Sequence, residues 1–161
     1  MHGSFMRKTI ILLLLVLSGQ TAFGQTIYKT YINARFGYSI AYPSSLLEPQ
    51  GEADNGDGQI FKNDNAEMRV YGTNLLLNET LEKEYQALLE ASDGIVAYKL
   101  LRTNFFVISV RSDGEIYYRK TIEKDDGAFV TFEIRYKESK KKIYDKAVKK
   151  IVKSFKVLSS E

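Results

Sequence analysis

The most informative segment of this 161-residue chain reads Phe36-Gly37-Tyr38-Ser39-Ile40-Ala41-Tyr42-Pro43. Large apolar residues alternate with small ones, which is the period of a strand with one buried face. Pro43 cannot donate a hydrogen bond to a neighbouring strand, and it favours an extended conformation for Tyr42. The segment therefore predicts a strand over residues 36–42, paired with a preceding strand over residues 26–31.

The chain becomes polar after Pro43. We predict one helical turn at Ser44–Leu47 and then a loop at Glu48–Gly58, because Pro49 and several glycines in this segment favour turns. Loops that are held by a rigid scaffold carry function more often than the scaffold itself. This loop is the first candidate for a recognition site, through the side chains of Asp54, Asn55, Asp57 and Gln59.

The same loop can be compared with a calcium-binding loop, in which several oxygen ligands converge within one tight turn. If Gly58 is aligned with the invariant glycine of such a loop, Asn55 and Asp57 fall at ligand positions. Ala53, however, occupies the first position, where a carboxylate is required, and Asp64 replaces the bidentate glutamate. The match is poor, and the other interpretation is a turn whose Asp and Asn side chains satisfy backbone donors.

The remaining strands are predicted to form antiparallel hairpins. Asp113-Gly114 and Asp126-Gly127 are strong signals for tight hairpin turns, and strands joined in this way must be antiparallel. Both alternating sets of residues in the last strands carry large apolar side chains, so we expect a sheet that is covered on both faces. The predicted strands are Gln59–Lys62, Glu67–Gly72, Ile95–Thr103, Phe105–Arg111, Glu115–Lys124 and Ala128–Lys137.

Two segments have the periodicity of helices. Leu81, Tyr85, Leu88 and Leu89 share one face of a first helix, which we expect Gly94 to end in the left-handed conformation. The second helix is predicted over Lys140–Phe155, with Ser139 as its cap. Its apolar stripe comprises Tyr144, Ala147, Val148, Ile151, Val152 and Phe155. Its lysines form a candidate basic face for an acidic partner, made of Lys141, Lys142, Lys146, Lys149, Lys150 and Lys153.

The N-terminus has the pattern of a secretory signal peptide. Arg7 and Lys8 precede an apolar run, Ile10–Leu17, and Ala22 and Gly24 supply the small residues of a cleavage site. The apolar run is too short to span a bilayer. We therefore predict a signal peptide over residues 1–24 and a single domain over residues 25–161. The mature protein is expected to be exported, periplasmic or secreted, soluble and monomeric, without a transmembrane segment.

The composition argues against several kinds of chemistry. The chain contains no cysteine, which excludes disulfides, thiolate catalysis, cysteine metal sites and a lipid anchor on cysteine. Its one histidine, His2, precedes the apolar run of the signal peptide and is lost on export, whether Met1 or Met6 is the true start. Histidine-based triads and metal sites are then excluded from the mature protein. We expect no enzyme activity, no catalytic residue, no metal and no cofactor.

The segment Phe36–Pro43 resembles the opening motif of the PsbP-like fold family, which is aromatic-glycine-aromatic-serine-apolar followed by Tyr-Pro. Lys153-Ser154-Phe155-Lys156 is similar to the close of the family's last helix, and the order of elements between the two motifs also fits. Oxygen-evolving photosystem subunits and a nuclear-transport protein that binds the GTPase Ran share this fold. The resemblance implies a bacterial exported relative with an α+β fold, a central antiparallel sheet of about six to eight strands covered by two helices, and a non-catalytic binding role.

Two functions remain open. The favoured one is an exported accessory or adaptor protein that binds an envelope or extracellular protein through the Pro43–Gly58 region or an edge strand. Nucleic acid is not expected as a partner outside the cytoplasm. The alternative is an exported small-ligand or calcium-binding protein that uses the Glu48–Gly58 loop.

Overall fold

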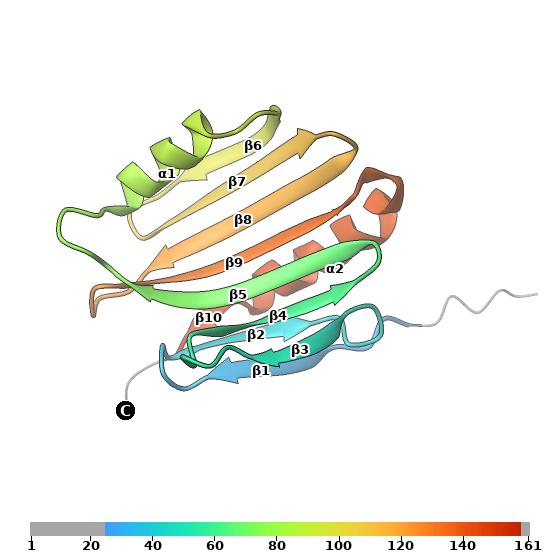
Figure 1. Cartoon of the computed structure of the whole chain (residues 1–161), viewed down its shortest axis with the longest axis horizontal. Helices are drawn as coiled ribbons and strands as arrows, with labels where there is room; N and C mark the ends of the chain where they lie inside the picture. Colours follow the sequence, from blue (N-terminus) through green and yellow to red (C-terminus); the bar gives the residue numbers. More distant parts are fainter. Residues whose placement is uncertain (1–24, 159–161) are drawn as a thin grey trace, which may run out of the picture.

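The computed structural model of the protein describes residues 25–158. Its largest element is an antiparallel sheet of seven strands in the order β3-β4-β5-β9-β8-β7-β6 (Figure 1). Strands that follow one another in the chain pair with one another, except where β5 pairs with β9. The strands are β3 (Glu48–Glu52), β4 (Gly58–Asn63), β5 (Ala66–Asn74), β6 (Ile95–Leu101), β7 (Phe105–Ser112), β8 (Glu115–Glu123) and β9 (Ala128–Lys137). The predicted signal peptide, residues 1–24, lies outside the described residues.

A second sheet of three strands contains most of the segment Phe36–Pro43. It consists of β1 (Lys29–Asn33), β2 (Tyr38–Tyr42) and β10 (Lys156–Val157), in the order β1-β2-β10. Tyr38, Ile40 and Tyr42 are buried, as their alternation predicts. The sequence did not indicate a separate sheet, because β10 has only two residues and both are exposed.

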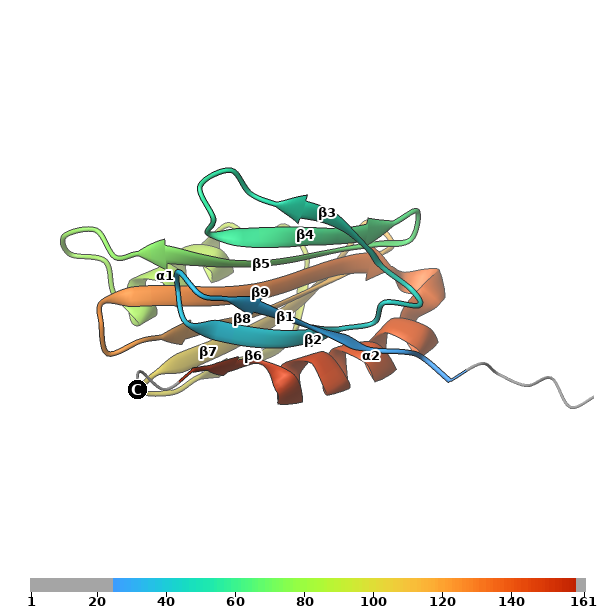
Figure 2. The ribbon, with the colours of Figure 1, turned by 90° about the horizontal axis from the view of Figure 1, so that it is seen from below.

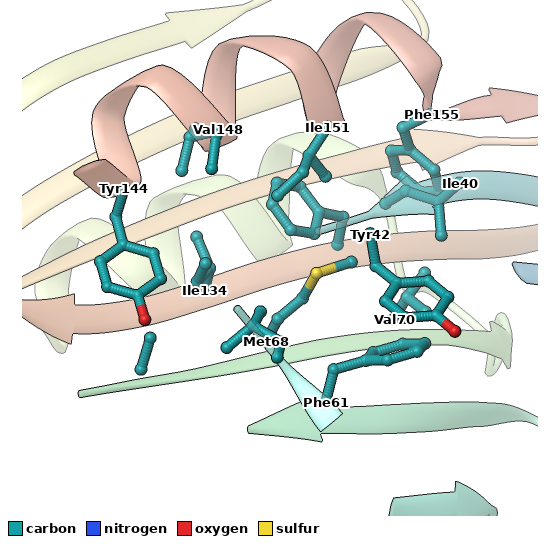
Figure 3. Packing of buried hydrophobic residues seen from close by; sticks show 14 of the residues in the cluster. Ile40, Tyr42, Phe61, Met68, Val70, Ile134, Tyr144, Val148, Ile151 and Phe155 are labelled. Carbon is teal, nitrogen blue, oxygen red and sulfur yellow. The ribbon is translucent and has the colours of Figure 1, made fainter. Parts of the chain in front are cut away.

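The two helices lie on opposite faces of the central sheet. The face under α2 (Lys141–Ser154) is also covered by the second sheet, and α1 (Leu81–Glu90) lies on the other face (Figure 2). A short 3₁₀ helix, η1 (Glu138–Lys140), leads into α2. In Figure 3 Ile151 of α2 points toward Met68 of the central sheet, and Ile40 of β2 lies beside Phe155, which follows the helix. The predicted α+β fold, a central antiparallel sheet between two helices, is confirmed.

The predicted loop at Glu48–Gly58 is wrong in its first half. Glu48–Glu52 forms the edge strand β3, which pairs with β4 and has an irregular register between Pro49 and Glu52. Every residue of β3 is exposed, so the strand has no buried set of side chains that would show alternation. An edge position also tolerates proline. Gly51, with a φ of 96°, allows the irregularity.

The predicted residue that ends α1 and the predicted residue that caps the start of α2 are wrong as well. The helix α1 ends at Glu90, the residue after it, Ala91, caps it in a right-handed conformation, and Gly94 does not cap it. Instead, the backbone of Gly94 approaches β7 so closely that an added Cβ would lie 2.2 Å from the carbonyl oxygen of Arg111. Ser139 does not cap α2, because it lies within η1 and the helix begins after Lys140.

Candidate functional site

The predicted recognition residues lie in and beside the hairpin turn that joins β3 to β4. The turn is closed by a hydrogen bond from the Ala53 amide to the Gly58 carbonyl, at 2.9 Å. The Asn55 side chain donates to the Asp57 carboxylate at 2.7 Å and accepts from the Asp57 amide at 3.3 Å. Asp54 is exposed, and Gln59 lies in β4 opposite Glu52. Asn55 and Asp57 are therefore brought together, while Gln59 belongs to the sheet.

The backbone oxygens of this turn are occupied by donors from the second sheet and β5. Asn33 donates to the carbonyl of Gly56 at 3.0 Å, and Arg35 donates to the carbonyl of Asn55. The Tyr38 hydroxyl and the Gly72 amide both donate to the carbonyl of Asp57, at 3.0 and 2.9 Å. Calcium loops need free carbonyl oxygens and convergent carboxylates. Within residues 25–158, no three acidic or histidine side chains are close enough to hold a metal ion.

The predicted basic face lies on the outer surface of α2. Lys142, Lys146, Lys149, Lys150 and Lys153 are exposed, while Lys141 is half-buried and pairs with Asp145. The Lys150 ammonium also lies 4.0 Å from the centre of the Tyr28 ring. The helix buries Tyr144, Ala147, Val148 and Ile151 instead, so the lysines occupy its solvated side.

A further surface, which was not predicted from the sequence, lies on the α1 side of the central sheet. The helix α1 packs over β6, β7 and the start of β9, with Leu81 and Tyr85 against Phe106 and Phe129, and leaves most of the face formed by β4, β5, β8 and β9 uncovered. The expected cover on both faces is therefore wrong for this half of the sheet. We call the uncovered surface the open sheet face, and it is formed by Glu67, Arg69, Tyr71, Tyr117, Arg119, Glu133 and Arg135.

The open sheet face contains three adjoining hollows of about 540, 390 and 370 Å³. The largest lies over Tyr117, Glu133 and Arg135 on the side facing η1, and the second lies between Tyr71 and the start of α1. Arg69 and Glu133 line both the first and the third hollow. Together they form a broad, shallow surface that extends across the sheet from β3 to β8, which is the shape of a protein-binding surface more than that of an enclosed ligand pocket.

Opposite charges alternate across the open sheet face. Register places Arg69 beside Glu133 and Glu67 beside Arg135, and β8 adds Arg119 on the other side of Glu133. Within β5, Arg69 pairs with Glu67 at 2.6 Å, and Arg135 pairs with Glu115 of β8 at 3.6 Å. Each charge therefore has an opposite charge nearby.

Arg119 is the centre of this network. Its side chain is buried against the Phe106 ring, and it donates to Glu84 of α1 at 2.7 Å and to the Thr121 hydroxyl at 3.1 Å. The Glu133 carboxylate lies 3.9 Å from the guanidinium and accepts a hydrogen bond from the Tyr117 hydroxyl at 2.8 Å.

Burial raises the pKa of Tyr117, and the negative charge of Glu133 raises it further. The phenol is thus a neutral donor at physiological pH. No buried side-chain nitrogen or oxygen among the described residues lacks a partner.

The strand register contains the signal that could have identified the open sheet face. In β5, β8 and β9 one alternating set is mostly apolar, while the other contains Glu67-Arg69-Tyr71, Tyr117-Arg119 and Glu133-Arg135. The Asp113-Gly114 turn, with φ values of 50° and 75°, was recognised as a hairpin turn. The pairing of β5 with β9 could not be predicted, because these two strands are far apart in the chain.

This arrangement of two helices around an antiparallel sheet is the PsbP-like fold, which Mog1 proteins also have. The solution structure of cyanobacterial PsbP (CyanoP) from Synechocystis sp. PCC 6803 is 13% identical, covers 88% of this chain and 98% of its own, and superposes with a TM-score of 0.58. The crystal structure of the Ran-binding protein Mog1p from Saccharomyces cerevisiae is 10% identical, with 84% and 97% coverage and a TM-score of 0.53. A point mutant of protein Mog1 is 9% identical, with 83% and 97% coverage and a TM-score of 0.55.

At these identities the likeness shows the fold alone. No protein-family model matches the sequence, and no curated protein matches it. Within residues 25–158, no helix has the length and apolar character needed to cross a membrane.

Proposed function

We propose that this chain is an exported, non-catalytic accessory or adaptor protein that acts as a monomer, and that its open sheet face binds another protein. The observation that carries the proposal is the composition of that face. Tyrosine and arginine are among the residues most enriched in the energetically important parts of protein interfaces, and here Tyr71, Tyr117, Arg69 and Arg135 lie on the same face of three adjacent strands.

The electrostatics of the open sheet face favour binding over catalysis. A general acid or base needs a carboxyl group or imidazole whose pKa is tuned toward neutrality, usually in an enclosed site. On this face the carboxylates of Glu67 and Glu133 pair with arginines, and the hollows are open to solvent. An alternating charge pattern instead selects a partner with the complementary pattern.

The resemblance to binding proteins supports the same class of function. The similar Mog1p structure is that of a Ran-binding protein. Export of this chain rests on the signal-peptide pattern of residues 1–24 and is tested by N-terminal sequencing of the mature protein from cell fractions, with cleavage after Gly24 as the expected result.

The binding surface is tested by charge reversal. The double variant Arg69→Glu/Arg135→Glu changes two exposed side chains of the open sheet face, and Lys142→Glu/Lys149→Glu makes the same change of charge on α2. Immobilised wild-type protein is expected to retain a specific partner from an envelope extract of the source cells. The first variant should lose that partner and the second should retain it. Loss of the partner by the α2 variant alone would instead assign binding to the basic face.

A further inference from the structure

The two edges of the central sheet differ in how well they are protected against pairing with another strand. Natural sheets protect their edges with charges, proline and bulges. The edge strand β3 reads Glu-Pro-Gln-Gly-Glu and has an irregular register, so it combines all three devices. At the opposite edge, β6 reads Ile-Val-Ala-Tyr-Lys-Leu-Leu, with no proline, no acidic residue and a single lysine (Figure 1).

The strand β6 also exposes apolar side chains. Three of the nine large apolar residues that are exposed in the described part of the chain belong to this one strand, namely Ile95, Val96 and Tyr98. Ile95 is 74% exposed and Tyr98 is 51% exposed. β-branched and aromatic side chains at such positions are the ones that pack against a neighbouring strand. A register shift between Val96 and Tyr98 leaves Tyr98–Leu101 as the regular part of the edge.

The backbone groups that point outward from this regular part can be identified from the hairpin turn. The Arg102 amide donates to the Phe105 carbonyl at 2.9 Å, so these two residues form a hydrogen-bonded pair. Bonded and non-bonded pairs alternate along an antiparallel ladder. Leu100–Val107 and Tyr98–Ser109 are then the next bonded pairs, and the amides and carbonyls of Lys99 and Leu101 point away from β7. Among residues 25–158, no strand pairs with β6 on that side.

The charged side chains of the β6–β7 hairpin itself are all basic. Residues 95–112, which form the whole β6–β7 hairpin, contain Lys99, Arg102 and Arg111 and no acidic residue. A second copy of the chain pairing through β6 would bring two such sets of cations together. Like charges in cross-strand positions are destabilising, whereas opposite charges are stabilising. The charge pattern therefore favours a different chain that carries acidic side chains.

We propose that β6 binds an extended segment of another protein as an additional antiparallel strand. The segment would exchange backbone hydrogen bonds with Lys99 and Leu101, place apolar side chains beside Tyr98, and carry an acidic side chain opposite Lys99. This binding site lies beyond β7 from the open sheet face. Its test uses a peptide and does not depend on the capture experiment, so either proposal can fail alone.

The probe is a synthetic peptide of about ten residues, long enough for one strand, that alternates valine with threonine and aspartate. A matched peptide carries lysine in place of aspartate. Amide hydrogen exchange of the unaltered protein is followed by NMR in the presence of each peptide. The aspartate peptide is expected to slow exchange at Lys99 and Leu101 by at least about tenfold, which corresponds to roughly 1.4 kcal/mol of added protection. The lysine peptide is expected to have no such effect.

The variant Lys99→Pro removes one outward amide and leaves the ladder to β7 intact, because proline is tolerated at an edge position whose amide faces solvent. It is expected to weaken binding of the aspartate peptide by at least about tenfold, whereas Lys99→Ala, which retains the amide, should still bind. Protection at β3 in place of β6, equal affinity of Lys99→Pro and the wild type, or no binding at about 1 mM peptide would each overturn the proposal. Self-association that Lys99→Pro abolishes would overturn it too, since the strand would then pair with a second copy.

Discussion

Gly72 shows how closely the second sheet approaches the central one. A Cβ built on this residue of β5 would lie 2.0 Å from the Phe36 ring, which is far inside van der Waals contact. Phe36 is buried, so the ring cannot move away without disturbing the core. We predict that Gly72→Ala lowers the free energy of unfolding by about 2–3 kcal/mol, as overpacking of a core does. Urea denaturation measures this.

The matched variants for this prediction carry a smaller side chain in place of the Phe36 ring. In a Phe36→Leu background the added methyl group has more room, so Gly72→Ala should cost clearly less there than in the wild type. Equal costs in the two backgrounds would contradict the assigned contact.

Arg119 is the residue whose loss should cost most on the open sheet face. Its guanidinium is buried and faces Glu84 and Glu133, so Arg119→Leu leaves two carboxylates without their cation. We predict a loss of about 2 kcal/mol in urea denaturation, somewhat less than for a fully buried pair because Glu84 is partly exposed. The control is Arg135→Leu, whose side chain is 63% exposed and whose pair should contribute less than about 1 kcal/mol. A similar cost for both variants would contradict the central role of Arg119.

Residue roles of this kind are only partly predictable from sequence. The alternation of Tyr38, Ile40 and Tyr42 predicted their burial correctly, since strand periodicity is local. The predicted role of Gly94 as a helix cap was wrong. A glycine is required there because the Arg111 backbone, on another strand, leaves no room for a side chain. The network of Arg119 joins residues of α1, β8 and β9, and no local pattern shows that they meet.

At the scale of elements, α2 is joined to β2 by one hydroxyl group in addition to the packing of the core. Ser154, at the end of α2, accepts a hydrogen bond from the Ala41 amide at 2.8 Å and donates to the Ile151 carbonyl at 2.6 Å. We predict that Ser154→Ala costs about 1–2 kcal/mol in urea denaturation, because the Ala41 amide loses its partner.

Ser92→Ala is the control for this joint. Its hydroxyl only donates to the Leu88 carbonyl at the end of α1 and joins no two elements, so its loss should cost less than about 0.5 kcal/mol. If the two variants are equally stable, the Ser154 bond does not hold the second sheet to the helix.

Elements with a buried face were predictable, and elements without one were not. The helix α2 was located to within a residue or two because Tyr144, Val148 and Ile151 record its buried side. The strands β3 and β10 have only exposed residues and exist through backbone pairing with β4 and β2. Composition alone therefore indicated a loop where β3 lies. Of the predicted recognition loop, only the turn at residues 53–57 lies outside a regular strand.

For the molecule as a whole, the buried tyrosines predict how stability changes at high pH. Seven of the eleven tyrosines have a raised pKa, mainly because burial disfavours the phenolate, and that of Tyr31 and of Tyr118 is raised to about 12. In the unfolded chain these groups ionise near pH 10. Unfolding therefore becomes more favourable as the pH rises above 10. The stability that the neutral phenols contribute is lost progressively as the pH rises from the pKa of the unfolded chain toward the pKa values of the folded protein.

We predict that most of the tyrosinate absorbance at high pH develops together with loss of structure, between about pH 10 and 12. Absorbance and circular dichroism recorded on the same samples test this, and the chain contains no tryptophan to interfere. A titration that is complete near pH 10 with the fold intact would contradict it.

The pairing of β2 with the end of the chain also sets the order in which the protein can fold. The Ala41–Ser154 bond spans 113 residues, and α2 and β10 both lie against β2. At synthesis rates of 5–20 residues per second, roughly 6 to 23 s pass between the emergence of the two partners. During that interval the apolar side of β2, with Tyr38, Ile40 and Tyr42, has no helix to cover it. A nascent chain of this fold therefore exposes the apolar side of β2 at least until α2 has been synthesised.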